Sequence, residues 1–93
     1  MSKSNPTVMV TDDEKSIRNS LRDILEFEDY NVLEAESGSD VFELLAEQPV
    51  DLMLLDIKMK GMDGMEILTK LKEENHQFPV IMISGHGNIE IAV

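Results

Sequence analysis

The sequence predicts an α/β fold built on a doubly wound parallel sheet. Three observations support this fold class. Apolar runs alternate with amphipathic segments along the chain, two of the runs are apolar on successive residues, and acidic residues follow two of the runs. Strand and helix patterns in alternation favour a parallel sheet with helices on both faces. We expect one domain over residues 1–93, with a flexible N-terminus at residues 1–6.

Four strands are expected, at residues 7–10, 32–35, 50–57 and 79–84. The first is a short β-branched run that follows Pro6. The third and fourth are apolar on successive residues, which predicts that both of their faces are buried.

A first helix is expected after the first strand. Ile17, Leu21 and Ile24 recur at helical spacing, so they are predicted to face the core, with Arg18 and Arg22 outside. The amphipathic pattern supplies a helix that can cover one face of the sheet.

Two further helices and the start of a fourth are expected. The second is capped by Ser39 or Asp40, and the third runs to about residue 74. The segment IEIAV, residues 89–93, follows a glycine-containing loop and is predicted to be the first turn of the fourth helix.

Composition limits the classes of partner. With 8 Lys+Arg against 19 Asp+Glu, the formal net charge is −11. This sign argues against direct contact with nucleic acid and fits a basic protein partner or a bound cation. Without cysteine there is no disulfide or thiolate metal site. Because the sequence has no leader and no apolar run of about 20 residues, we expect a cytoplasmic protein without membrane contact.

Polar side chains stand at the ends of three predicted strands. Asp12 and Asp13 follow the first strand, Asp56 closes the third, and Ser84 closes the fourth. The carboxyl ends of parallel strands meet at one edge of a sheet, where ligands bind. Like charges 4 Å apart repel by about 4 kcal/mol at an effective dielectric near 20, and a divalent cation relieves such repulsion.

Oxygen ligands without histidine or cysteine point to Mg²⁺ at this edge. Two simpler roles remain open for each acid taken alone. Asp12 or Asp13 could cap the first helix, and Asp56 could be an ordinary turn residue.

Three segments carry a resemblance to a known family: VMVTDDEKSIR, LMLLDIKMKGMDGMEIL and PVIMISGHGNIEIAV. Together they resemble the receiver domain of bacterial two-component response regulators, and are most similar to the NtrC/NtrX type. The resemblance covers residues 7–93. It implies a flavodoxin-like (CheY-like) fold that is incomplete here, truncated after the start of the fourth helix and lacking the fifth strand and fifth helix.

The resemblance also implies roles for individual residues. Asp56 matches the aspartate that accepts a phosphoryl group from a sensor histidine kinase. Asp12 and Asp13 match the acidic pair that holds Mg²⁺ with Asp56, and Lys58 would give its backbone carbonyl to the metal. Ser84 matches the switch hydroxyl. The implied function is a switch for a downstream, transcriptional output and not an enzyme.

Departures from the family pattern support an alternative. The family's lysine on the fifth strand has no counterpart here, and Lys60 stands where proline is common. A phosphorylation-incompetent interaction or dimerisation fragment is therefore the alternative. The missing helix would leave apolar sheet surface exposed beside the first helix, and the fourth strand would be an open edge. We therefore expect a homodimer or swapped assembly, with residues 85–87 as the hinge.

Two other functional classes fit the sequence less well. An aspartyl phosphatase of the dehalogenase type needs a second acid two residues after the nucleophile, where this chain has Lys58. A flavodoxin-like cofactor binder needs a first loop that cradles phosphate, whereas Asp12, Asp13 and Glu14 would repel it.

Overall fold

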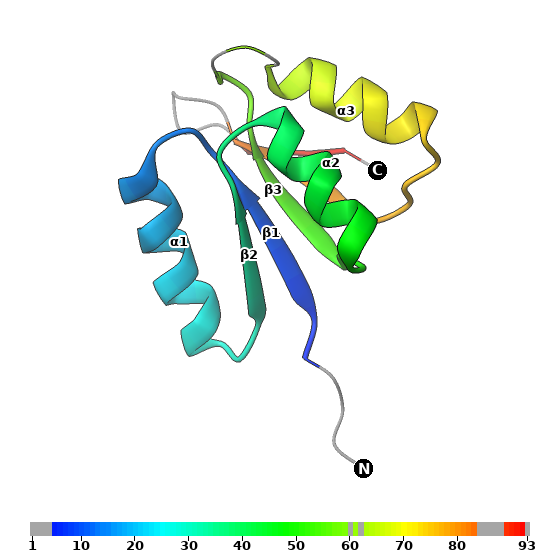
Figure 1. Cartoon of the computed structure of the whole chain (residues 1–93). Helices are drawn as coiled ribbons and strands as arrows, with labels where there is room; N and C mark the ends of the chain where they lie inside the picture. The colour runs from blue at the N-terminus through cyan, green and yellow to red at the C-terminus, as the bar shows by residue number, and fades with distance from the viewer. Residues whose placement is uncertain (1–4, 60, 62, 84–88, 93) are drawn as a thin grey trace.

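The sheet and three helices form the described part of the chain (Figure 1). A computed structural model describes residues 5–59, 61, 63–83 and 89–92. In chain order the elements are β1 (Thr7–Thr11), α1 (Lys15–Phe27), β2 (Asn31–Ala35), α2 (Gly38–Glu47), β3 (Leu52–Asp56), α3 (Gly64–Glu73), β4 (Val80–Ile83) and β5 (Ile89–Ala92).

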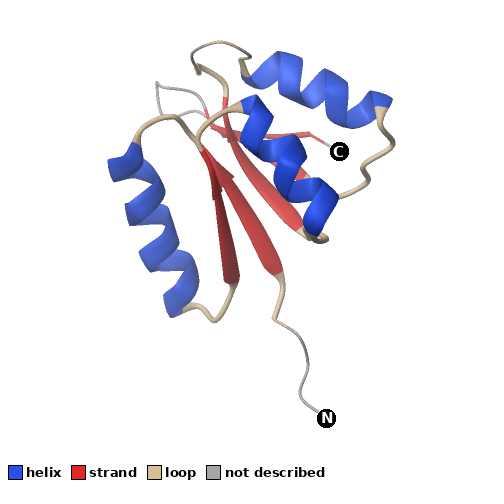
Figure 2. Cartoon of the chain, viewed as in Figure 1, coloured by secondary structure: helices blue, strands red, loops and turns tan. Residues whose placement is uncertain are grey.

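The strands lie in the order β2-β1-β3-β4-β5, and β2, β1, β3 and β4 are parallel. Helix α1 lies on one face of the sheet, whereas α2 and α3 lie on the other (Figure 2). The predicted doubly wound parallel sheet is confirmed. The chain order reverses between β1 and β3, which places the switch point of the sheet where their carboxyl ends meet.

The prediction of a helix at residues 89–93 is wrong. Residues Ile89–Ala92 form β5, which pairs antiparallel with β4 in a register that joins Ile81 to Ile91. The predicted open edge at β4 is therefore occupied. A helix this short is marginal in water, whereas pairing satisfies the backbone groups of β4.

The core lies between the sheet and the two helices α2 and α3. Its side chains are apolar and nearly inaccessible to solvent, and they come from the four parallel strands, from both helices and from the loops on either side of β3. The cluster consists of Met9, Ala35, Val41, Val50, Met53, Leu55, Met59, Ile67, Leu68, Leu71, Val80 and Met82. Burial of these apolar side chains stabilises the domain through the hydrophobic effect.

The opposite face is packed differently from the prediction. In α1 the side chains of Ile17 and Ile24 are 40% and 61% exposed, whereas Arg18 is only 8% exposed. The predicted placement of Ile17, Ile24 and Arg18 is therefore wrong, whereas Leu21, also predicted to face the core, is half-buried. The helix lies over β1 and β2, and its two arginines turn toward Glu34 of β2, with which both form ion pairs.

The strands β3 and β4 are not fully buried on this second face. Leu54 and Ile81, which are register partners, are half-buried, in contrast to Met53 and Met82 on the core face. The prediction of complete burial on both faces is thus only half right. Apolar sheet surface is accessible on the side of α1, as the sequence led us to expect.

Side chains that differ from the predicted ones cap α2. The N-cap is Ser37, whose side chain accepts a hydrogen bond from the Asp40 amide (3.2 Å), so the predicted caps at Ser39 or Asp40 are wrong. Helix α3 begins with a capping box, in which Asp63 and Glu66 bond each other's backbone amides. Among the described residues, no helix combines the length and apolar character needed to span a bilayer.

Candidate metal centre

Three carboxylates meet at the carboxyl edge of the sheet, and we call Asp12, Asp13 and Asp56 the acid cluster. One oxygen of each lies within 4.8 Å of the others. The topology explains this proximity. The neighbouring strands β1 and β3 are in register at Thr11 and Leu55, so the residues that follow them emerge side by side. The expected convergence of these acids is observed.

Backbone hydrogen bonds hold Asp12 in place. Its side chain is buried, and its Oδ1 accepts a hydrogen bond from the Glu14 amide at 2.8 Å. Its own amide donates to the carbonyl of Ala35 in β2 at 3.0 Å. The N-cap of α1 is Glu14, without a side-chain capping bond. The N-cap position is therefore held by Glu14 and not by Asp12 or Asp13.

The environment of Asp56 opposes its ionisation. Partial burial raises the pKa of Asp56, and the negative charges of Asp12, Asp13 and Glu14 raise it further. The Lys58 amide, 3.2 Å from Asp56 Oδ1, acts in the opposite direction by stabilising the carboxylate. The ionised cluster therefore carries an electrostatic strain that a bound cation would relieve.

Gly64, the first residue of α3, lies close against the backbone at the end of β3. A Cβ at this position would lie 2.6 Å from the carbonyl oxygen of Asp56 and 2.7 Å from the Cα of Ile57. The Gly64 amide donates to the Ile57 carbonyl at 2.9 Å. The sequence signal for this close approach is the second glycine of GMDG, immediately before a helix.

Lys58 and its neighbours line an open cavity beside the acid cluster. The cavity has a volume of about 570 Å³ and is also lined by Asp13, Glu14 and Asp63. The Lys58 side chain is exposed. Ser84, Lys60 and the predicted hinge at residues 85–87 lie outside the described residues.

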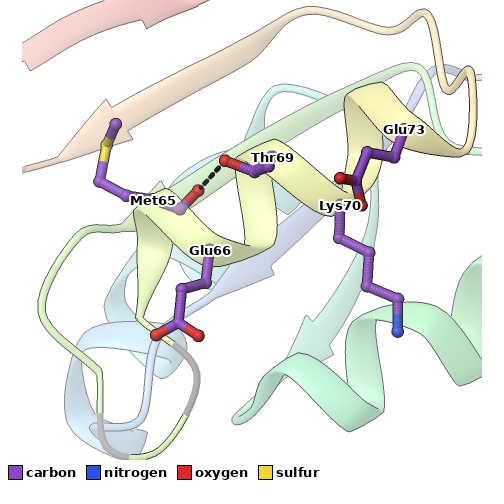
Figure 3. A pocket seen from close by; sticks show the side chains of 5 residues that line it. All are labelled: Met65, Glu66, Thr69, Lys70 and Glu73. Atoms are coloured by element: carbon purple, nitrogen blue, oxygen red, sulfur yellow. Dashed lines mark hydrogen bonds between the residues drawn. The ribbon is translucent and has the colours of Figure 1, made fainter.

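A second hollow lies on the outer side of α3 (Figure 3). Its volume is about 360 Å³, and it is lined by Met65, Glu66, Thr69, Lys70 and Glu73. The Thr69 hydroxyl donates to the Met65 carbonyl, and Lys70 extends over the Phe42 ring of α2 at 4.6 Å. These contacts are local to the helices, and the acid cluster remains the better candidate for chemistry.

The acid cluster fits a hard divalent cation. All three donors are carboxylates. Proteins bind Mg²⁺ through a small number of carboxylates, and water molecules or a phosphate oxygen complete the coordination shell of the ion. The chain is therefore a doubly wound α/β domain with an acidic, cation-binding type of site at the switch point, where the carboxyl ends of β1 and β3 meet.

Comparisons with known proteins identify the family of this domain. The profile of the response regulator receiver domain family matches residues 8–93, and the chain belongs to this family. The flavodoxin-like (CheY-like) architecture matches that of solved receiver domains. One such structure is the response regulator TrrA of Thermotoga maritima in complex with Mg²⁺–BeF. It has a TM-score of 0.79 and 29% identity, covering 87% of this chain and 72% of TrrA.

Curated relatives place the chain near the NtrX and NtrC regulators. It is 44% identical over 88 residues to a putative NtrX-like response regulator of Rickettsia bellii. It is 37% identical over 86 residues to the DNA-binding transcriptional regulator NtrC of Escherichia coli K12. Each match covers 92% of this chain but only 18% of the relative.

Proposed function

We propose that this receiver domain accepts a phosphoryl group on Asp56 from a phosphohistidine of a sensor histidine kinase. A carboxylate oxygen of Asp56 would form a bond to phosphorus as the P–N bond to the histidine breaks, and the imidazole nitrogen keeps the electron pair. The acid cluster is the observation that carries this proposal, because it places two further carboxylates beside the attacking one.

Mg²⁺ is the proposed cofactor. Asp12, Asp13 and Asp56 would hold it, and the resemblance adds the backbone carbonyl of Lys58 as a further ligand. Bound there, Mg²⁺ would neutralise negative charge on the transferring phosphoryl group. The relative TrrA, whose structure contains Mg²⁺–BeF, supports the choice of metal.

The chain's own residues would prepare the carboxylate. The Lys58 amide holds one oxygen of Asp56, which fixes the rotation of the side chain, and it also favours the ionised form required for attack. Ser84 is the proposed switch hydroxyl. A phosphoryl group adds nearly two negative charges and new acceptor oxygens, to which that hydroxyl could donate.

The proposed role is that of a switch and not of an enzyme, in a cytoplasmic two-component pathway. The name of the NtrC relative supports a transcriptional output. Because the chain spans only 18% of that relative, the proposed output would be carried by other segments of a longer regulator. The net charge of −11 favours protein partners over direct contact of this domain with nucleic acid.

Acetyl phosphate tests the proposal without a cognate kinase. With Mg²⁺ present, intact-protein mass spectrometry should detect the gain of one phosphoryl group. The gain should be absent from Asp56→Asn and after chelation of the metal. If the wild-type chain gains no phosphoryl group at any Mg²⁺ concentration, the alternative of a phosphorylation-incompetent interaction fragment is favoured.

Self-association is a further part of the proposal. Ile17 and Ile24 are exposed on α1, and Leu54 and Ile81 are only half-buried on the same side of the sheet. An apolar surface of this kind favours contact with a second copy of the chain, giving a homodimer.

A further inference from the structure

Arg18 is a buried cation close to the acid cluster. Within α1, all of which the structure describes, it is the only buried residue. Burial of a guanidinium is costly unless its donors are paired, and removal of its partners would leave an uncompensated charge. The hydrogen-bond partners of the Arg18 guanidinium therefore indicate the structural role of this side chain.

The guanidinium connects three chain segments. Its Nη1 donates to the backbone carbonyl of Asp12 at 2.7 Å, a buried hydrogen bond. Its Nε donates to Glu34 Oε1 in β2 at 3.1 Å, and its Nη2 lies 3.8 Å from Glu36 Oε2 just beyond that strand. The planar fork of arginine suits such simultaneous contacts, whereas lysine has only a single charged nitrogen.

The contact to Asp12 acts on both metal-ligand candidates. The carbonyl that accepts from Arg18 belongs to the peptide joining Asp12 to Asp13, and a peptide unit is planar. The amide on the other side of Asp12 is already bonded to Ala35. With both of its flanking peptide groups held, the direction in which the Asp12 side chain leaves the backbone is set, and the peptide that leads into Asp13 is held with it.

We propose that Arg18 is a positioning residue for the acid cluster. By holding the Asp12 carbonyl against β2, it sets the placement of the Asp12 and Asp13 carboxylates relative to Asp56. The role in cation binding rests on the proposed function, whereas the placement of the backbone does not.

Arg22 provides a matched control on the same helix. Its Nε lies 2.7 Å from Glu34 Oε2, so it shares a partner with Arg18. Its other contacts are Glu26 at 3.3 Å and the carbonyl of Val32 at 3.3 Å. Both of these lie at the opposite end of α1 and β2 from the acid cluster. Loss of Arg22 therefore removes a similar ion pair without releasing the Asp12 carbonyl.

The first arm of the test uses metal-free protein. Arg18→Ala and Arg22→Ala are compared by ¹H–¹⁵N NMR. Arg18→Ala should shift the amide signals of Asp12, Asp13 and Asp56, whereas Arg22→Ala should leave them close to wild type. Equal shifts in the two variants, or none in either, would overturn the positioning role whether or not the chain binds a cation.

The second arm measures Mg²⁺ affinity by calorimetry. Arg18→Ala should weaken binding by about 10–100-fold, the range typical of outer-shell partners, and Arg22→Ala should leave it nearly unchanged. If Arg18→Ala does not fold, Arg18→Lys is compared with Arg22→Lys, and only the former should weaken binding. Equal affinities would reject the role in cation binding. A wild-type chain that binds no Mg²⁺ would reject the proposed function, and the first arm would still decide the placement of the backbone.

Discussion

The two faces of the sheet are built by different interactions. On the face covered by α2 and α3, the side chains that meet are apolar and almost completely buried. On the α1 face two valines of β1 are buried as well, but the helix contributes no fully buried apolar side chain: it is anchored through Arg18 and Arg22 to Glu34 of β2, and its isoleucines are exposed. The first face is built for stability, whereas the second ties a helix to the loop that carries Asp12 and Asp13.

Burial alone does not identify the function of a helix. Apolar packing is non-directional and tolerates small shifts of an element. A charged hydrogen bond at 2.7 Å is directional, and it fixes the position of a particular backbone atom. The face that contributes less apolar burial is therefore the one better suited to place the acid cluster.

The largest expected difference between the faces is in stability. Ile67 of α3 is fully buried and Ile24 of α1 is mostly exposed, so they form a matched pair. Ile67→Ala should lower the free energy of unfolding by about 2–5 kcal/mol. Ile24→Ala should change it by less than about 0.5 kcal/mol. Urea denaturation measures both, and similar losses would contradict the division between the faces.

A smaller effect is expected where the packed face meets the acid cluster. Gly64→Ala places a methyl group against the backbone of Asp56 and should cost about 1–3 kcal/mol. Gly61 has a φ of +77° and open space around it, so Gly61→Asn should cost less than about 1 kcal/mol. Thermal denaturation compares the two, and a tolerated Gly64→Ala would refute the close approach.

The acid cluster itself should be mildly destabilising without metal. The pKa of Asp56 is raised by folding, so the folded protein holds this proton more tightly than the unfolded chain does. Ionisation above that pKa therefore lowers stability. In Mg²⁺-free buffer at neutral pH, Asp56→Asn should therefore be more stable than the wild type, because it removes the charge that the fold opposes.

The pH dependence checks the cause of that difference. As the pH falls through the raised pKa of Asp56, the wild-type carboxyl takes up its proton and the advantage of Asp56→Asn should shrink. Urea denaturation across this range gives the two stability curves. A difference that stays constant with pH would show that electrostatic strain at Asp56 is not responsible.

The weakest expected effect is self-association through the α1 face. Light scattering should show a mass that rises with protein concentration, and Ile24→Lys should reduce that rise because it places charge on the apolar surface. Added salt should favour association, since it screens the net charge of −11. A monodisperse monomer at all concentrations would contradict the homodimer.

Periodicity and turn chemistry predicted much of the fold. Apolar residues in succession predicted β3 and β4, because buried parallel strands have this pattern, and a short β-branched run after Pro6 predicted β1. The order of acids and strands also predicted the acid cluster, since topology alone brings Asp12, Asp13 and Asp56 to one edge.

Tertiary pairing determined what the sequence did not reveal. Helical spacing assigned Ile17 and Ile24 to the core, but Glu34 on β2 turned Arg18 inward, and such a partner is invisible to a one-dimensional pattern. Apolar and polar residues alternate over Ile89, Glu90 and Ile91, yet the strand–helix order favoured a helix there. These residues form a strand because pairing with β4 satisfies backbone N–H and C=O groups that a short helix would leave unpaired at the edge of the sheet.

Cation binding by the acid cluster is tested most directly with Mn²⁺, a paramagnetic ion that prefers the same oxygen ligands as Mg²⁺. Titration should first broaden the amide signals of Asp12, Asp13 and Asp56, and excess Mg²⁺ should reverse the effect. Broadening spread evenly over the surface acids, with no preference for these three residues, would contradict the account.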